Sequence, residues 1–219
     1  MCIRDSFNTD LEGDGAFICQ NSWGDNFGEN GFFYISYYDT NIGTHNVVYT
    51  DIENTDNYDH IYQSDLCGWV GQLGYNKDSI YGANVFTAEG NETLKAASFY
   101  ATGKDSQYEL YVVRQFEDET SLEKMIPVAS GKLGNAGYYT VDFNQGIEVD
   151  AGERYAVVLY IITPGSVHPM AIEYAADEAT ENVDLDDGES YISANGSKWV
   201  SVDTVEKSNL CIKAFSDNR

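Results

Sequence analysis

Residues 154–163 read Arg-Tyr-Ala-Val-Val-Leu-Tyr-Ile-Ile-Thr. Successive side chains of a strand point to opposite faces of the sheet, and in this run both alternating faces are apolar. A strand of this kind is buried on both sides. We therefore expect residues 154–163 to form a central strand that other parts of the chain cover on each face.

Other runs of strand-forming residues follow one another along most of the chain, separated by turn signals. Their spacing of roughly ten to twenty residues is typical of a β-sandwich or a jelly roll. Helical patterns are nearly absent, and residues 120–125 and 175–182 would each form at most a turn or two. We therefore expect an all-β fold with a jelly-roll-like sandwich. The expected strands cover residues 83–88, 94–102, 108–114, 138–143, 154–163, 170–174, 190–193 and 210–215.

The second of these runs has a one-sided pattern. Ser98, Tyr100 and Thr102 alternate with Phe99 and Ala101. Because alternate residues of a strand share a face, the pattern predicts one wetter face beside an apolar one.

The composition agrees with a secreted all-β protein. Aromatic residues make up 14% of the 219 residues, with 17 Tyr against 3 Pro, and aromatic residues favour strands. The formal net charge of −24 argues against nucleic acid and anionic membranes as partners, because so acidic a surface repels phosphate. No apolar run approaches the ~18 residues that cross a bilayer, so we expect no membrane span.

Four cysteines lie far apart in the chain, at Cys2, Cys19, Cys67 and Cys211. Their spacing does not match a zinc site. A disulfide between Cys67 and Cys211 forms if the two ends of the C-terminal domain meet. Otherwise these thiols remain unpaired.

An acidic cluster near the C-terminus offers hard oxygen ligands. Asp184, Asp186, Asp187 and Glu189 have the donor chemistry that calcium prefers, but Gly188 falls one position too early for an EF-hand loop. A solvated acidic loop explains the same residues. We predict no metal site and no cofactor, and keep Asp184, Asp186 and Asp187 as the candidates for calcium.

Near the N-terminus, a polar turn joins two apolar runs. Residues 16–24 read Ala-Phe-Ile-Cys-Gln-Asn-Ser-Trp-Gly, and residues 27–36 read Phe-Gly-Glu-Asn-Gly-Phe-Phe-Tyr-Ile-Ser. Gly24, Gly28 and Gly31 allow tight turns between the runs. The segment therefore predicts a β-hairpin.

This hairpin resembles the asparagine segment of papain-like cysteine peptidases over roughly twenty positions. Gln20 and Phe27 depart from the commonest pattern of that family. The resemblance implies that Asn21 orients the catalytic histidine and that Trp23 shields the hydrogen bond between them. An imidazole must hold one tautomer and one ring orientation to exchange a proton with a thiol. A hydrogen bond that does this is stronger where water is excluded.

The other two catalytic groups of that family do not precede Asn21 here. In papain-like enzymes the cysteine and the histidine both come before the asparagine, but the first fifteen residues contain no histidine. Cys2 is in the wrong place in the sequence to be the nucleophile. Cys19 lies inside an apolar strand, where we expect an inert buried thiol. The three histidines all follow Asn21: His45, His60 and His168. We therefore expect a C-terminal fragment, without the signal peptide, that is inactive when taken alone.

A second resemblance covers residue 56 to the C-terminus. Residues 83–86, 94–100, 108–112, 136–140 and 209–215 are similar to the lectin-like domain that follows papain-type peptidases in many anaerobic bacteria. The two resemblances imply a peptidase fragment over residues 1–40, a connector over 41–55 and a lectin-like β-sandwich over 56–219. If the sandwich binds glycans, Trp69, Trp199 and some of the tyrosines are the aromatic platforms. The alternative is that these rings fill the core or its rim.

Together the resemblances imply the C-terminal part of a secreted or cell-surface papain-like cysteine peptidase with an appended lectin-like domain. The intact parent would hydrolyse peptide bonds through a thioester. The implied partners are the peptide or protein substrate of the parent and a glycan or cell-surface protein. The alternative is a non-catalytic carbohydrate- or protein-binding adhesion module, in which the hairpin only packs against the sandwich.

Overall fold

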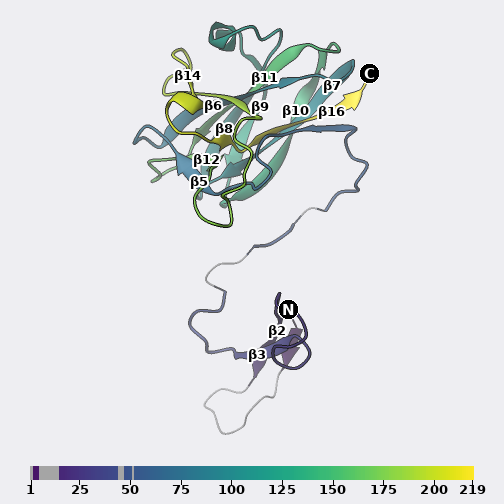
Figure 1. Cartoon of the computed structure of the whole chain (residues 1–219), viewed down its shortest axis with the longest axis vertical. Coiled ribbons are helices and arrows are strands. Elements are labelled where there is room, and N and C mark those ends of the chain that lie inside the picture. The colour runs from purple at the N-terminus through teal and green to yellow at the C-terminus, as the bar shows by residue number, and fades with distance from the viewer. Residues whose placement is uncertain (1, 5–14, 44–46, 51) are drawn as a thin grey trace. The chain divides into compact units, whose positions relative to one another are not determined.

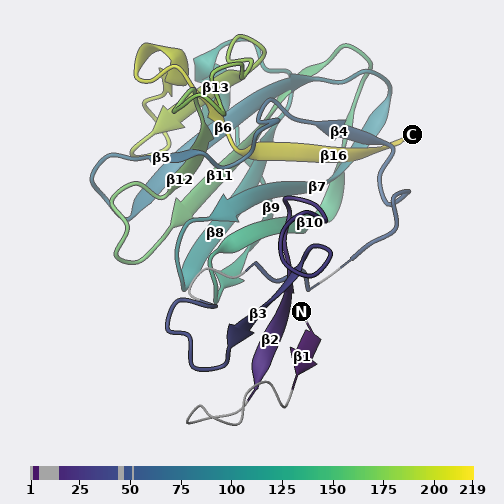
Figure 2. The ribbon, with the colours of Figure 1, turned by 60° about the horizontal axis from the view of Figure 1, so that its bottom comes forward.

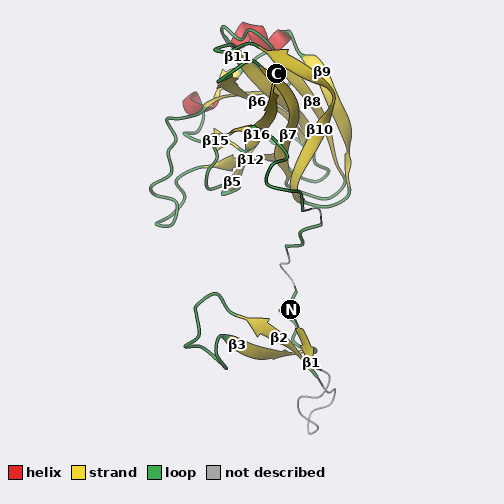
Figure 3. Ribbon diagram, turned by 90° about the vertical axis from the view of Figure 1, so that its right-hand side faces the viewer, coloured by secondary structure: helices red, strands yellow, loops and turns green. Residues whose placement is uncertain are grey.

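The computed structural model describes residues 2–4, 15–43, 47–50 and 52–219. Contacts between residues divide the chain into two compact units, Met1–Glu53 and Asn54–Arg219. Strands are the main regular elements of both units (Figures 1 and 3). No helix among the described residues is long and apolar enough to cross a membrane.

The first unit contains an antiparallel sheet of three strands, ordered β1-β2-β3. β1 (Cys2–Arg4) pairs with β2 (Ala16–Gln20), and β2 pairs with β3 (Phe32–Ser36). The hairpin expected from the sequence is therefore confirmed, with Gln20 opposite Phe32 at its turn end.

The second unit is a β-sandwich of antiparallel sheets. The four-stranded sheet consists of β10 (Gly137–Val149), β7 (Glu92–Ala101), β16 (Ile212–Asn218) and β4 (His60–Tyr62), in that order. The six-stranded sheet consists of β14 (Val200–Ser201), β13 (Glu189–Ser193), β6 (Ser79–Thr87), β11 (Arg154–Ile162), β8 (Ser106–Val113) and β9 (Ile126–Leu133). A third sheet consists of β15 (Asn209–Leu210), β12 (Met170–Glu173) and β5 (Gly71–Leu73). Figure 2 shows β4, β16 and β7 side by side.

Two short 3₁₀ helices complete the described elements, η1 (Glu119–Glu123) and η2 (Val202–Thr204). η1 begins with a capping box, because the Asp118 carboxylate accepts from the backbone N–H of Ser121 and the Ser121 hydroxyl accepts from the backbone N–H of Asp118 at 3.5 Å. The same carboxylate accepts from the backbone N–H of Thr120 at 3.0 Å. The expected turn of helix near residues 120–125 is thus confirmed.

Strand β11 is buried on both faces, as its sequence predicts. Tyr155 and Leu159 belong to the main core, together with Phe99 of β7 from the facing sheet. Ala156 and Val158 point the other way, into a second apolar cluster that includes Leu122 of η1. Each large apolar side chain buried in this way stabilises the fold by roughly 1.5–3 kcal/mol.

One expectation from the sequence is wrong, and one open alternative is decided. The predicted wetter face of β7 fails at Ser98, which is fully buried, because the Tyr138 hydroxyl of β10 covers it and donates to Ser98 Oγ at 2.5 Å. Of the two alternatives for Cys67 and Cys211, the structure shows the unpaired one. Both thiols are free, with Cys67 exposed and Cys211 buried.

A buried carboxylate joins the edge strand β4 to the rest of its sheet. Glu92 is fully buried and accepts from the hydroxyls of Tyr62 at 2.7 Å and Ser216 at 2.5 Å, and from the backbone N–H of Gly90 at 2.8 Å. Burial raises the pKa of this carboxyl, but the hydrogen bonds outweigh burial and hold the pKa of Glu92 below its ordinary value. One charged group therefore connects β4, β7 and β16.

Replacing Glu92 by Gln should lower the free energy of unfolding by about 2–3 kcal/mol at neutral pH, because a charged acceptor is lost from three buried hydrogen bonds. Folding lowers the pKa of Glu92, so the stabilisation is present above about pH 4.3 and disappears as the pH falls through the folded-state pKa. The difference between wild type and Glu92→Gln should therefore shrink on acidification. Urea unfolding at a series of pH values measures this.

Glu89→Gln is the matched control. The Glu89 side chain is 75% exposed and lies 3.6 Å from the His60 ring, which also neighbours Glu92. Its replacement should change stability by no more than about 0.5 kcal/mol. Equal losses in the two variants would contradict the role given to the buried network.

Candidate functional site

Asn21 directly follows β2, and hydrogen bonds within the turn fix its side-chain amide. Nδ2 donates to the carbonyl oxygens of Gly31 at 2.9 Å and Phe27 at 3.3 Å, and Oδ1 accepts from the backbone N–H of Trp23 at 2.6 Å. Both hydrogens of Nδ2 are used in this way. Oδ1 keeps a second lone pair, because an amide oxygen accepts two hydrogen bonds.

The turn holds these acceptors in place through a glycine. Gly28 has a φ of +70°, and a Cβ at this position would lie 2.1 Å from the carbonyl oxygen of Phe32. Any other residue would force the backbone apart here. The close approach lets Glu29 and Phe32 form a bridge, which places Gly31 opposite Asn21.

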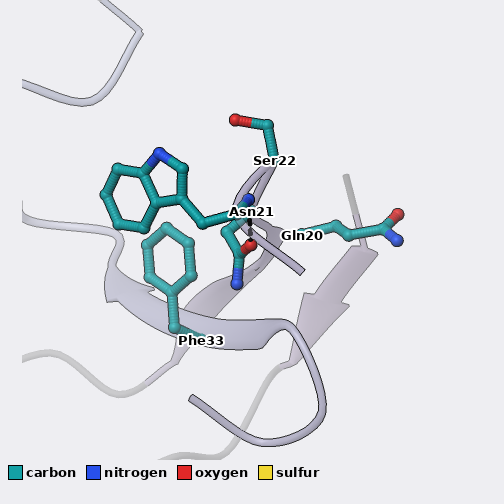
Figure 4. Close-up of a pocket in the computed structure, with 5 residues that line it drawn as sticks. Gln20, Asn21, Ser22 and Phe33 are labelled. Atoms are coloured by element: carbon teal, nitrogen blue, oxygen red, sulfur yellow. Dashed lines mark hydrogen bonds between the residues drawn. The ribbon is translucent and has the colours of Figure 1, made fainter. Parts of the chain in front are cut away.

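A cavity of about 330 Å³ opens beside this amide (Figure 4). Its lining consists of Gln20, Asn21, Ser22, Trp23 and Phe33. Figure 4 shows the Asn21 amide near the Phe33 ring, whereas the Gln20 side chain extends away from it.

Aromatic rings form one wall of the cavity. Phe27 packs edge to face against Trp23 at 5.2 Å and against Phe33 at 5.6 Å between ring centroids. Of the two rings that line the cavity, Trp23 is 76% exposed and Phe33 is half-buried. A fixed amide oxygen beside an exposed apolar wall can receive the N–H of a ring that enters the cavity.

No cysteine or histidine is among the residues that line this cavity. Cys19 is half-buried in β2 as a free thiol. His60 lies on β4 of the sandwich, where a hydrogen bond to Asn218 and the charges of nearby carboxylates raise its pKa. His168 lies in the loop before β12, and His45 lies outside the described residues.

The acidic residues near the C-terminus do not converge on one point. Asp186 pairs with Lys207 at 2.8 Å, Glu189 pairs with Arg154, and Asp184 accepts from the backbone N–H of Asp186. The described part of the chain contains no group of three or more carboxylate, histidine or cysteine side chains arranged to hold a metal ion. Asp184, Asp186 and Asp187 thus do not form a ready-made metal site in the structure. Calcium binding by these residues stays a prediction.

Asn209 is a buried polar centre that the sequence did not reveal. Its side chain is almost fully buried, and its Nδ2 lies within 3.2 Å of four oxygen atoms. They are the carbonyls of Ser64 and Asp184 and the carboxylates of Glu173 and Asp187. Asn209 thus connects β15 with β12 and with two loops.

The two aromatic candidates, Trp69 and Trp199, lie in different ring clusters. Trp69 is 37% exposed and packs on Tyr100, which contacts Tyr138. Trp199 is half-buried and meets Tyr81 edge to face at 6.2 Å. Tyr81 in turn stacks on Tyr160 at 4.2 Å with ring planes 20° apart, a pair that sequence reasoning did not single out.

A family model described as a lectin-like domain matches residues 61–216. Two solved structures of the cysteine protease Cwp84 each match 99% of the chain: a clostridial one after propeptide cleavage, and the cysteine protease and lectin-like domains of the surface-layer-associated protein of Clostridium difficile. Sequence identity is 24% for the first and 22% for the second, with TM-scores of 0.79 and 0.74. The chain covers 56% and 50% of those structures, about half their length. No curated protein matches the sequence.

Replacing Asn209 by Ala should lower the free energy of unfolding by about 2–4 kcal/mol, because buried oxygens lose their donor. Burial raises the pKa of Asp187 and the Asn209 hydrogen bond opposes this, so the variant should raise that pKa further. A carboxyl with a raised pKa destabilises the fold when it is ionised. The loss should therefore be larger at pH 7 than near pH 4 in denaturant unfolding. The exposed Asn182→Ala should leave stability unchanged, and a similar loss there would contradict the assignment.

Proposed function

This chain belongs to the lectin-like domain family, and from that premise we propose that it is the C-terminal part of a cell-surface cysteine peptidase whose sandwich binds a glycan. Asn21 is the orienting residue of a Cys-His-Asn site in the intact protein, and Trp23 is its shield. The observation that carries the peptidase proposal is the amide of Asn21, fixed by the turn with one lone pair of Oδ1 left to accept.

The chemistry needs such an acceptor. In a cysteine peptidase the histidine takes the thiol proton, the sulfur bonds to the substrate carbonyl carbon, and the histidine then gives the proton to the leaving amine. Water afterwards hydrolyses the thioester. An amide oxygen that accepts from one ring nitrogen leaves the other nitrogen free to serve the thiol. Because the amide is held by the turn, it can position the imidazole without reorganising.

The proposed location rests on the relatives. One solved structure similar to this chain is described as a surface-layer-associated cysteine protease, and the net charge of −24 suits a solvated extracellular surface. The peptidase substrate is a peptide or protein. The chain taken alone is expected to be inactive, because the cavity beside Asn21 has no cysteine or histidine in its lining.

A second candidate is adhesion without catalysis. The observation that favours it is the presence of aromatic clusters on the outer faces of the sandwich, since ring faces and edges are common contacts for sugars and proteins. In that case the chain alone would carry the whole function, and the hairpin would serve only in packing.

Asn21→Ala in the longer protein that supplies the cysteine and the histidine should lower kcat on the order of a hundredfold and leave KM nearly unchanged. The acid limb of the pH profile should also move, because the imidazole loses the acceptor that favours its charged form. Trp23→Ala, which leaves the amide in place, should lower kcat roughly tenfold. Hydrolysis of a fluorogenic peptide measures both.

Asn26→Ala is the control from the same turn, where the Asn26 side chain is exposed. It should keep wild-type kinetics. Full activity in Asn21→Ala would refute the orienting role, and equal losses in Asn21→Ala and Asn26→Ala would show that the turn matters only for folding.

A further inference from the structure

The outer face of the six-stranded sheet is only partly covered. At one end, Leu122 of η1 and Phe116 pack over Ala83 of β6 and Val158 of β11. Beyond that apolar cover, the outward side chains of the same strands are polar or aromatic, apart from Ile162. The uncovered part of the face is therefore open to solvent.

Two cross-strand rows cross this uncovered part. Tyr81 on β6 lies opposite Tyr160 on β11, Tyr160 opposite Glu109 on β8, and Glu109 opposite Ser130 on β9. The adjacent row places Ile162 opposite Gln107, and Gln107 opposite Lys132. Directly opposite residues share a face of the sheet, so these side chains stand together on the outside.

A cavity of about 370 Å³ lies over the rows. Its lining includes Tyr160, Ile162, Gln107, Glu109, Ser130 and Lys132. This volume falls in the range of about 300–1,000 Å³ that is usual for small-molecule sites. Tyr81 covers one side of the Tyr160 ring, and the other side of that ring borders the cavity.

The polar groups at this cavity are available to a ligand. Within the described part of the chain, the side chains of Gln107, Ser130 and Lys132 make no hydrogen bond or ion pair with protein atoms. Glu109 accepts from the Tyr111 hydroxyl, which leaves most of its acceptor capacity free. Donors and acceptors thus alternate around one aromatic wall.

The outer face of the four-stranded sheet differs in this respect. There the Tyr138 hydroxyl donates to Ser98, and Lys213 binds Gln63 and Asp65. These polar groups are already paired with one another. Trp69 is exposed, but the ring of its neighbour Tyr100 packs against both Trp69 and Tyr138.

We propose that the cavity over Tyr160, Gln107, Glu109, Ser130 and Lys132 binds one stretch of a neutral oligosaccharide. This inference rests on the proposed glycan-binding function and names its site. Sugar rings present an apolar face for a tyrosine ring and rows of hydroxyls for mixed donors and acceptors. A polyanion is disfavoured by the net charge of −24, and the binding groups are side chains on a sheet face rather than the free backbone edge that an extended peptide would pair with.

The test uses the full 219-residue chain against a panel of immobilised neutral oligosaccharides of hexose and N-acetylhexosamine units, followed by calorimetry with the best binder. Tyr160→Ala should raise the Kd at least tenfold. Gln107→Ala and Lys132→Ala, which alter exposed and unpaired side chains, should raise the Kd about three- to tenfold without changing thermal unfolding. Tyr138→Ala on the opposite sheet, and Trp69→Ala in the loop that packs on Tyr100 of that sheet, should bind as the wild type does.

The outcomes separate this site from the glycan-binding function itself. If the wild type binds and only Trp69→Ala or Tyr138→Ala loses affinity, the sandwich binds glycans on its other sheet and the site proposed here is wrong. If the wild type binds no member of the panel, both the site and the glycan-binding function are overturned. Affinity lost in Gln107→Ala and Lys132→Ala, with unchanged melting, supports the site even if Tyr160→Ala is unstable.

Discussion

A strand with two apolar faces is stable only when both faces are removed from water, and β11 imposes this condition on the whole sandwich. One face of β11 is covered by the main core, to which the facing sheet contributes Phe99. The other face requires a second cover, which the segment containing η1 supplies through Leu122 and Phe116. That segment is short and covers only Ala156 and Val158 of β11. Tyr160 and Ile162, farther along the strand, are left to line an open cavity.

The strands that the sequence predicted are those with a strong apolar pattern. All eight expected runs lie on strands of the structure, because burial on one or both faces leaves a readable alternation. β9 was missed because Pro127 and Gly131 interrupt its pattern. It tolerates the proline as an edge strand whose pairing shifts at Leu110 and Tyr111 of β8. β4 and β5 have three residues each, too few to show a period.

The candidate sites differ in whether their contacts are local in the sequence or are made only by the topology. The resemblance to papain-like peptidases singled out Asn21, whose role stays a prediction, and every group that holds its amide lies within ten residues of it in the chain. Asn209 was not, since its acceptors come from Ser64, Glu173 and Asp187, which only the topology brings together. The sequence predicts that Ser98 faces water, because a serine on the outer side of a strand gives no sign of the Tyr138 side chain that covers it. The tyrosine pair on β6 and β11 depends in the same way on strand register.

The sandwich, residues 54–219, contains two cysteines, and both are free. Burial raises the pKa of the Cys211 thiol, so it stays protonated and unreactive in the core. This unit is held together by buried apolar area and by polar networks such as that of Glu92, with no covalent cross-link of its own. Its folding therefore needs no oxidant and no disulfide-exchange enzyme. A domain built in this way keeps one structure in reducing and in oxidising surroundings.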